Sequence, residues 1–403
     1  MKRIVILCDG TWNRSDSATP TNVVQLAQAL APRDADGHSQ VPIYVQGVGT
    51  GQGVSVLSRW SDRFLGGALG WGLLENIAEA YRHLVFLWEP GDEIHIFGFS
   101  RGAYTARSLT GLIRSTGIPS RAALARVPEA VKRYRTLDDD RTHPDHADSH
   151  AFRAGLSPQV VTSQREAEWR AAQGLPKVPR LRIAYLGVWD SVAALGLPAH
   201  LPVIGPAMAR RYRFHDSALS SMVRSARHAV ALDERRRSFA AVRWGNVDVL
   251  NDGADPPRDG TPDYQELFFA GDHGSVGGGG DIRDLSSIAL DWIIEGAARS
   301  GLAFDETARA AIRAERNPAG PLHNRSVPSA SLSDRITRLR PADREGPKSV
   351  AELHPSALER WMMPERKAAG AAFRTYRPGS LSGIEAELVA MLDRQEDDPS
   401  GVA

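Results

Sequence analysis

The chain has 403 residues, with 49 Lys and Arg against 48 Asp and Glu, so its formal charge is +1. A protein that binds nucleic acid without sequence preference carries a strongly basic surface, and this balance argues against that class. Hydrophobic residues make up 42% of the chain and charged residues 24%, which supplies a packed core and excludes disorder of the whole chain.

Short apolar runs bounded by turn residues recur along the first 300 residues and alternate with helical patterns. Such runs are typical of strands buried on both faces of a sheet. In chain order we predict strands at 3–8, 42–45, 93–97, 181–188 and 267–270, and helices at 22–30, 73–88, 103–113, 218–232 and 285–298. The repeated strand–helix order predicts an α/β fold: a doubly wound, mostly parallel sheet with helical insertions and a cap.

Three stretches interrupt this alternation. Residues 118–180 are rich in Arg, Ala and Asp and predict an exposed insertion, whereas 193–214 are apolar, irregular and proline-containing, as in a lid over a pocket. We expect one catalytic domain over 1–302, with its catalytic residues before 303. The remaining residues, 303–403, form a C-terminal extension that we expect to be partly helical, at 350–362 and 381–392, with a disordered tail.

The single cysteine, Cys8, excludes a disulfide framework and a cysteine-based metal site. Its apolar neighbours predict a buried strand residue. Only five apolar residues, Cys8 included, lie between Arg3 and Asp9, too few for the core of a signal peptide. We therefore expect synthesis as a cytoplasmic protein, with any export independent of a cleavable signal.

The strongest local motif is Gly98-Phe99-Ser100-Arg101-Gly102, located where a predicted strand ends and a predicted helix begins. Flanking glycines permit the tight turn that exposes a nucleophilic serine above a sheet. The N-terminus of the following helix favours negative charge at the same place. Ser100 is therefore the candidate nucleophile, the alternative being an ordinary glycine-bounded turn.

A serine hydroxyl needs a base, and the base needs an acid to orient it. In α/β-hydrolases these follow in the order Ser, acid, His, each after a strand. His273 follows the predicted strand 267–270 and is the best base, while Asp190 follows the predicted strand 181–188 and is the best acid. Asp190 as a simple cap residue is the structural alternative. The less favoured candidates are Asp272 and Asp281 as acids and His228, in a predicted helix, as a supporting base.

The loop Asp9-Gly10-Thr11 closes the first predicted strand. In this fold an early strand-to-helix loop supplies one donor of the oxyanion hole, and the residue after the nucleophile supplies the other. We predict the backbone N–H groups of Arg101 and of Gly10 or Thr11 as the donors. Asp9 is a possible supporting residue, although its commoner role is to form the turn.

No metal or cofactor is expected. His143, Asp145, His146, Asp148 and His150 have the composition of a metal cluster but lie in a polar stretch without ligand spacing, which favours a solvated loop. The run Gly277 to Gly280 has neither the Lys-Ser/Thr pair of a phosphate loop nor a dinucleotide pattern, so nucleotide binding is a weak alternative.

The ordered motifs resemble a known family: the largely uncharacterised α/β-hydrolase family that includes the catalytic domains of type VI secretion lipase effectors of the first class. The resemblance covers roughly residues 1–300. Its motifs are Asp9-Gly10-Thr11-Trp12-Asn13, Thr21-Asn22-Val23, Gly47-Val48-Gly49-Thr50, Gly98-Phe99-Ser100-Arg101-Gly102-Ala103, Gly187-Val188-Trp189-Asp190-Ser191-Val192, Arg227-His228-Ala229-Val230-Ala231-Leu232-Asp233-Glu234-Arg235 and Ala270-Gly271-Asp272-His273.

This resemblance implies a bacterial Ser100–His273–Asp190 hydrolase that cleaves a carboxylic ester through an acyl-enzyme, with a phospholipid or another acyl ester as substrate and a peripheral membrane contact as a possibility. One position departs from the family pattern His-Ser-Asp-Val-Gly-Gly-Gly: this chain has Ser275 where the family has the Asp. The second hypothesis is therefore a hydrolase-fold protein that binds a ligand or partner with weak or no turnover. The oligomeric state is open.

Overall fold

The computed structural model describes residues 1–49, 67–136, 140–193, 218–254, 260–326, 341–363, 367–368, 371–372 and 375–397. The predicted lid at 193–214 lies almost entirely outside these residues. None of the described helices is long and apolar enough to cross a membrane.

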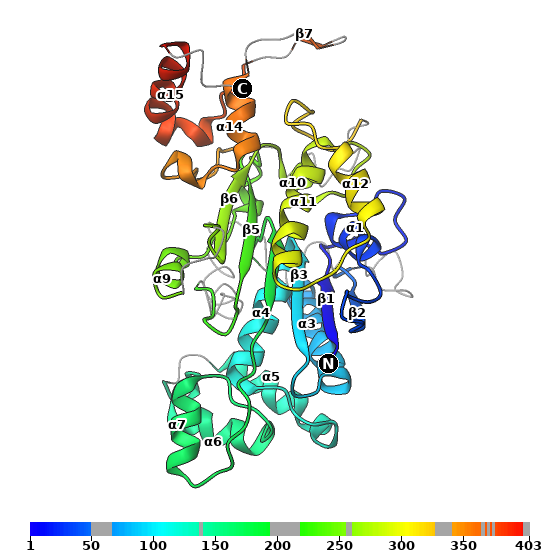
Figure 1. The fold of residues 1–403 in the computed structure, drawn as a ribbon, viewed down its shortest axis with the longest axis vertical. Coiled ribbons are helices and arrows are strands. Elements are labelled where there is room, and N and C mark those ends of the chain that lie inside the picture. Colours follow the sequence, from blue (N-terminus) through cyan, green and yellow to red (C-terminus); the bar gives the residue numbers. More distant parts are fainter. Residues whose placement is uncertain are drawn as a thin grey trace.

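A parallel sheet of six strands forms the centre of the described structure, in the order β2-β1-β3-β4-β5-β6 (Figure 1). All five pairings are parallel. The carboxyl ends of the strands therefore lie along one edge of the sheet, where α/β proteins place their sites. The strands are β1 Arg3–Cys8, β2 Gln40–Val45, β3 Glu93–Phe99, β4 Tyr185–Trp189, β5 Ala226–Ala231 and β6 Tyr264–Phe269.

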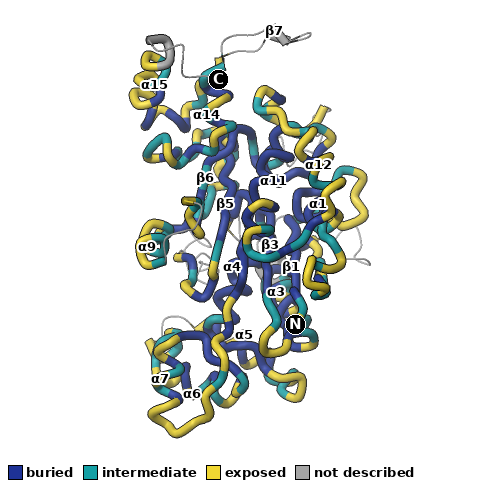
Figure 2. Tube along the Cα trace, in the orientation of Figure 1, coloured by how far each residue is buried: buried dark blue, intermediate teal, exposed yellow. Residues whose placement is uncertain are grey.

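Helices cover both faces of the sheet, because alternate strand residues point to opposite faces. On β1, Ile4 and Ile6 belong to one buried cluster, whereas Val5 and Leu7 belong to another. The first cluster contains α3 Gly67–Leu87, α4 Arg101–Thr116 and α5 Val127–Arg135; the second contains α1 Asn22–Ala29, α11 Asp284–Arg299 and α12 Glu306–Ala314. The predicted doubly wound architecture is confirmed, and Figure 2 shows the buried strands between the helical layers.

One predicted helix is wrong. Within 218–232 the structure has β5, which pairs with β4 on one side and β6 on the other. All six residues of this strand are buried. Their spacing resembles a helical pattern in sequence, but a position between two strands buries every side chain, and Arg227 and His228 find their partners in distant segments.

The predicted insertion is more ordered and more buried than its composition suggests. It contains η1 Arg121–Arg126, α5, η2 Asp140–Thr142, α6 Ala147–Leu156 and α7 Gln164–Ala172. Arg153 of α6 pairs with Glu166 of α7 at 2.9 Å, and the two side chains are 1% and 0% exposed. A buried charge pair of this kind ties the insertion together, so only its outer surface is solvated.

The C-terminal extension packs against the edge strand β6. Leu353 forms an isolated parallel bridge with Phe268, and the backbone N–H of His354 donates to the carbonyl of Phe268 at 2.9 Å. Val230 and Phe268 of the sheet share a third buried cluster with Trp361 and other residues of the extension. Besides α12, the described elements of the extension are η4 Val350–Glu352, α14 Pro355–Met362, β7 Lys367–Ala368, β8 Ala371–Ala372, η5 Gly379–Ile384 and α15 Glu385–Asp397.

Three further short elements complete the described chain: η3 Arg237–Phe239 and α9 Val247–Asp252 between β5 and β6, and α10 His273–Gly277 after β6. In Figure 1, α14 and α15 lie at the opposite end of the molecule from α6 and α7.

Candidate active site

Ser100 occupies a sharp turn between β3 and α4. Its φ of 59° and ψ of −122° belong to a region that residues other than glycine rarely adopt. A Cβ on Gly98 would lie 2.4 Å from the carbonyl oxygen of Gly102, and a Cβ on Gly102 would lie 2.1 Å from the carbonyl oxygen of Cys8. These contacts are with backbone atoms, so only glycine fits at both positions. The turn is the nucleophile elbow that the motif predicts.

The strand ladder places Ser100 beside Asp190. The N–H of Ser100 donates to the carbonyl of Trp189 at 3.0 Å, and the N–H of Asp190 donates to the carbonyl of Ala229 at 2.8 Å. Asp190 also has a positive φ, 38°. The chain therefore turns sharply after β3 and again after β4, next to each other on the same edge of the sheet.

The structure brings together the three predicted catalytic residues. His273, the first residue of α10, has Nδ1 at 2.5 Å from Asp190 Oδ2 and Nε2 at 2.8 Å from Ser100 Oγ. A carboxylate only accepts, so Nδ1 carries the hydrogen and Nε2 accepts the hydroxyl of Ser100. The ring of His273 contacts the rings of Phe99 and Phe239, at centroid distances of 4.6 and 4.8 Å.

The other two carboxylates considered as acids have different roles. Asp272 is the N-cap of α10: its Oδ1 accepts the N–H of Ser275 at 2.9 Å and the hydroxyl of the same residue at 3.0 Å. Asp281 accepts the N–H of Ser326 at 3.0 Å. Neither contacts His273 through a hydrogen bond among the described residues.

The first loop lies against the nucleophile, because a Cβ on Gly10 would be 3.2 Å from the Cβ of Ser100. One predicted donor is corrected. The N–H of Gly10 donates to Asp9 Oδ1 at 2.7 Å and is therefore not free for an oxyanion. Of the two alternatives, Thr11 remains as the candidate oxyanion donor of this loop. The side chain of Arg101 donates to Thr11 Oγ1 at 2.7 Å and so joins the loop to the elbow.

Asp9 shapes the first loop, as its commoner role predicts. Its carboxylate accepts hydrogen bonds from Thr21 Oγ1 at 2.9 Å and from the hydroxyl of Tyr44 at 2.7 Å, in addition to the bond from Gly10. Burial raises the pKa of the Asp9 carboxyl, and these hydrogen bonds oppose the rise. Asp9 thus holds the loop rather than the substrate.

His228 is not a base for Ser100. It lies in β5, fully buried, where Nε2 accepts the N–H of Ser191 at 3.1 Å and Nδ1 lies 2.8 Å from Glu266 Oε2. Because Nε2 accepts, Nδ1 carries the hydrogen and donates to the carboxylate. His228 therefore fixes the backbone directly after Asp190.

Arg344, which belongs to none of the sequence motifs, binds Asp190, the candidate acid. Its Nη1 donates to Asp190 Oδ1 at 2.6 Å and its Nη2 to Oδ2 at 2.9 Å. Burial alone raises the pKa of the Asp190 carboxyl, but the Arg344 guanidinium and the hydrogen bond from His273 hold this pKa far below its usual range. No local pattern separates Arg344 from the many other arginines of the C-terminal region, so the sequence carried no signal for it.

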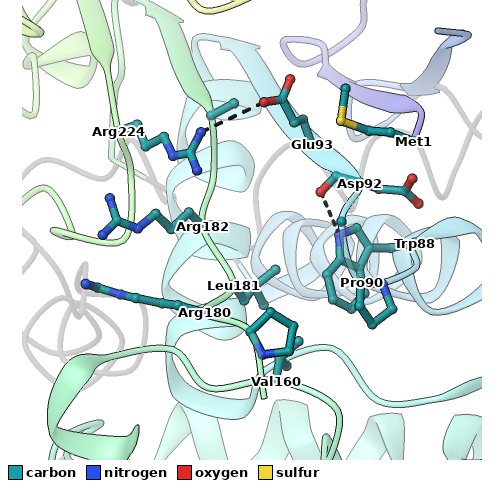
Figure 3. Close-up of a pocket in the computed structure, with 13 residues that line it drawn as sticks. Met1, Trp88, Pro90, Asp92, Glu93, Val160, Arg180, Leu181, Arg182 and Arg224 are labelled. Carbon is teal, nitrogen blue, oxygen red and sulfur yellow. Dashed lines mark hydrogen bonds and ion pairs between the residues drawn. The ribbon is translucent and has the colours of Figure 1, made fainter. Parts of the chain in front are cut away.

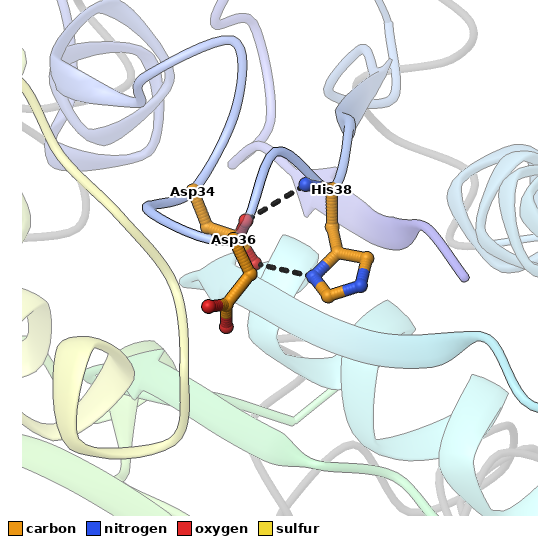
Figure 4. A group of neighbouring side chains, drawn as sticks. All are labelled: Asp34, Asp36 and His38. Carbon is orange, nitrogen blue, oxygen red and sulfur yellow. Dashed lines mark hydrogen bonds and ion pairs between the residues drawn. The ribbon is translucent and has the colours of Figure 1, made fainter.

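The described residues hold no histidine cluster of the kind that the insertion suggested. Asp145 pairs with Arg114, and His146 caps α6 by accepting the N–H of Asp148. The group that could hold a metal ion in the described part of the chain is Asp34, Asp36 and His38 (Figure 4). Asp34 already pairs with Arg3 and His38 there, which leaves this group as an ion-paired turn.

A pocket of about 170 Å³ lies at the opposite, amino-terminal edge of the sheet (Figure 3). Asp92 and Glu93, which precede and begin β3, line one side of it, and the exposed arginines Arg180, Arg182 and Arg224 line the other. Glu93 pairs loosely with Arg224 at 3.9 Å. Because Ser100 follows the far end of β3, this pocket is separate from the candidate active site.

Comparison with known proteins identifies relatives. The chain is 28% identical over 246 residues to the uncharacterized protein YEL023C of Saccharomyces cerevisiae, covering 59% of this chain and 32% of that one. Two solved structures match with low TM-scores: an uncharacterized protein from Pseudomonas aeruginosa (0.39, 20% identity, 79% of this chain and 49% of that one) and the Tle1 effector bound to the VgrG spike of the type 6 secretion system (0.35, 17% identity, 70% and 52%).

This chain thus spans about a third of the length of the curated relative and about half of each of the two solved chains. The family model described as the T6SS phospholipase effector Tle1-like catalytic domain matches residues 2–296, nearly three quarters of the chain. The chain belongs to this family of Tle1-like catalytic domains.

Proposed function

We propose that this protein is a serine hydrolase that cleaves the carboxylic ester of a phospholipid, or of another acyl ester, through an acyl-enzyme on Ser100. The family supports lipase or esterase activity in general terms. The observation that carries the serine mechanism is the chain of hydrogen bonds from Ser100 Oγ to His273 Nε2 at 2.8 Å and from His273 Nδ1 to Asp190 at 2.5 Å.

In the first step, His273 Nε2 takes the proton of Ser100 as Oγ attacks the carbonyl carbon of the ester. Asp190 holds the ring and balances the charge of the imidazolium. The oxyanion of the tetrahedral intermediate would lie near the backbone N–H groups of Arg101 and Thr11. Arg101 is the first residue of α4, so its N–H has no acceptor within the helix.

The intermediate then collapses: the bond from the carbonyl carbon to the leaving alcohol breaks, and the imidazolium gives its proton to that alcohol. A water molecule enters, His273 takes one of its protons, and the hydroxide attacks the acyl-enzyme. Release of the carboxylic acid restores Ser100. Each proton moves between Nε2 and an oxygen, so the scheme needs neither a metal nor a cofactor.

The decisive test compares the purified protein with a Ser100→Ala variant on short-chain esters and on phospholipid vesicles. Ser108→Ala is the matched control, because Ser108 is a buried serine of the same helix that follows the elbow. We expect hydrolysis by the unaltered protein and the Ser108 variant and its loss in the Ser100 variant. Equal rates for all three proteins would reject the serine mechanism.

The alternative, a binding protein without turnover, is motivated by Ser275, which stands where the family pattern has Asp. In the structure the hydroxyl of Ser275 contacts Asp272 and the carbonyl of Leu322, and the hydrogen bonds that join Ser100, His273 and Asp190 do not involve it. This geometry favours catalysis over binding alone. A fluorophosphonate probe separates the two: a reactive Ser100 becomes labelled, whereas folded protein without labelling would indicate the binding role. Contact with a membrane surface stays a prediction.

A further inference from the structure

In the described part of the C-terminal extension, the side chain that binds the proposed catalytic acid, Asp190, is that of Arg344. Arg344 binds both oxygens of Asp190, at 2.6 and 2.9 Å, in the paired geometry that a guanidinium forms with a carboxylate. The same guanidinium donates to the carbonyls of Ala231 and Phe239, so it also joins the end of β5 to the segment beyond it. The Arg344 side chain is 7% exposed and Asp190 is 0% exposed.

Hydrogen bonds occupy the acceptor positions of both oxygens of the Asp190 carboxylate. Oδ2 lies within hydrogen-bond distance of His273 Nδ1 and Arg344 Nη2, and Oδ1 accepts from Arg344 Nη1 and from the N–H of Ala231 at 3.0 Å. An ionised carboxylate has about four acceptor positions. Arg344 occupies two of them and leaves Oδ2 turned toward His273, which fixes the direction of the acid.

The backbone that carries Arg344 is anchored on both sides. The N–H of Ala342 donates to the carbonyl of Arg235 at 3.0 Å, and Asp343 pairs with Arg235 Nε at 2.9 Å. Two residues further on, Gly346 is so close to Ser380 of η5 that a Cβ would lie 1.6 Å from its carbonyl oxygen. The segment is therefore enclosed between the loop after β5 and the rest of the extension.

A second, indirect connection runs from the extension to the residue after Asp190. Glu352 of η4 pairs with Arg243 at 2.8 Å, and Arg243 pairs with Glu266 at 2.7 Å. Glu266 holds His228, which accepts the N–H of Ser191. Both connections begin beyond the part of the chain that the family model matches, residues 2–296.

We propose that Arg344 is a positioning residue of the active site, by which the docked C-terminal extension sets the orientation and charge of Asp190 and hence the action of His273 on Ser100. This inference rests on the serine hydrolase function proposed above. The inference also gives the extension a role. If the extension were absent, the carboxylate of Asp190 would remain buried in the family-matched core without the cation of Arg344, and a buried charge without its partner is strongly destabilising.

Removing the charge of Arg344 should also change the pH dependence of the reaction. Without this cation, Asp190 stabilises the imidazolium more strongly, so His273 is protonated more readily and the acid limb of kcat/KM moves to higher pH. Among the described residues, the charged groups recorded against the triad are Arg344, which pairs with Asp190, and Glu234, which lies next to His273 and itself pairs with Arg236.

The test uses the full chain with Arg344→Ala, Arg344→Lys and, as a control, Arg377→Ala. Arg377 is an exposed arginine of the same extension whose guanidinium donates to the carbonyl of Trp361, away from Asp190. We expect Arg344→Ala to lower kcat up to about 100-fold with little change in KM, because misplacing a catalytic group by an ångström has an effect of that size. Lysine should restore part of the rate, and low concentrations of guanidinium should rescue the alanine variant where equal sodium chloride does not.

A readout independent of turnover is the low-field NMR signal of the proton between His273 Nδ1 and Asp190, assigned by its loss in His273→Gln. We expect this signal to shift or disappear in Arg344→Ala and to persist in Arg377→Ala. If Arg344→Ala left kcat, the acid limb of the pH profile and the NMR signal unchanged, the proposal would be overturned. It would also be overturned if Arg344→Ala and Arg377→Ala lowered kcat equally and guanidinium did not rescue the Arg344 variant. A signal that responds to Arg344 in a protein without Ser100-dependent turnover would reject the proposed function and retain the positioning role.

Discussion

His228 accepts a hydrogen bond from the backbone N–H of Ser191 at 3.1 Å, and so holds the residue that follows Asp190, the proposed catalytic acid. The imidazole is buried and neutral in this arrangement, because its Nδ1–H donates to Glu266 at 2.8 Å. Glu266 also accepts the N–H of Trp244 at 2.8 Å. His228, which the sequence suggested as a supporting base, therefore fixes the backbone next to Asp190 instead.

The first prediction concerns this contact. His228→Leu leaves the N–H of Ser191 and the carboxylate of Glu266 without their shared partner, which should cost about 1–3 kcal/mol of stability. Asp190 should lose its fixed position, so kcat should fall while KM changes little. Steady-state kinetics and chemical denaturation check both parts. A variant with full kcat and reduced stability would show that His228 supports the fold alone.

The second prediction concerns the elbow. In Gly102→Ala the new methyl group would lie 2.1 Å from the carbonyl oxygen of Cys8, and neither backbone can move without opening the sheet edge. We expect a loss of at least about 1–3 kcal/mol and loss of Ser100 labelling by fluorophosphonate. The control is Gly155→Ala in α6, where the space is open, and where alanine should be neutral or slightly stabilising. Equal thermal midpoints for the two variants would contradict the packing argument.

The third prediction concerns Ser275, the position where this chain departs from the pattern of the family it resembles. The side chain is 2% exposed, and its hydroxyl contacts Asp272 Oδ1 and the carbonyl of Leu322 at 3.0 Å each. Ser275→Asp would set a second carboxylate against these oxygens, so we expect lower stability and no gain in kcat. A rise in kcat would show that the serine limits catalysis and would revive the low-activity hypothesis.

The fourth prediction concerns acid stability. His95 lies within β3, and burial lowers its pKa to about 4, against an ordinary value of 6.5. In the unfolded chain His95 therefore binds a proton below about pH 6.5, whereas in the folded chain it binds one only below about pH 4. This group should remove stability as the pH falls through that window, by about 3 kcal/mol in total, since each pKa unit corresponds to about 1.4 kcal/mol.

The comparison for this prediction is His95→Gln, which keeps a donor for the carbonyl of Ser300, at 3.1 Å from His95 Nε2, but takes up no proton. The free energy of unfolding is measured by urea denaturation at a series of pH values between 7 and 4. We expect the unaltered protein to lose more stability on acidification than the variant does. Parallel curves would show that His95 does not bind the proton as argued.

Much of the fold follows from local patterns in the sequence. Strands such as β1 and β3 are mostly apolar and bounded by turn residues, and helical patterns alternate with them, so the doubly wound sheet could be predicted. β5 could not be predicted, because its sequence is rich in alanine and places Arg227 next to His228, without the apolar run that is typical of a buried strand. Its strand conformation depends on the two neighbouring strands and on partners far along the chain.

The same division applies to the site. The elbow glycines and the order Ser100, Asp190, His273 are encoded locally. Ser100 and Asp190 directly follow β3 and β4, His273 comes four residues after the end of β6, and parallel strands end at one edge. Sequence alone left Gly10 and Thr11 as equal candidates for the oxyanion hole, and only the hydrogen bond from Gly10 to Asp9 separates them.

The sequence by itself determined the candidate residues for the proposed chemistry, because a nucleophile elbow needs glycines at fixed positions and the triad of this fold follows three strands. Only the tertiary structure decided how the acid is held: Arg344 reaches Asp190 from 154 positions away in the chain. Such a contact leaves no local pattern, because an arginine in a polar segment has the same sequence context whether it ends in solvent or on a buried carboxylate.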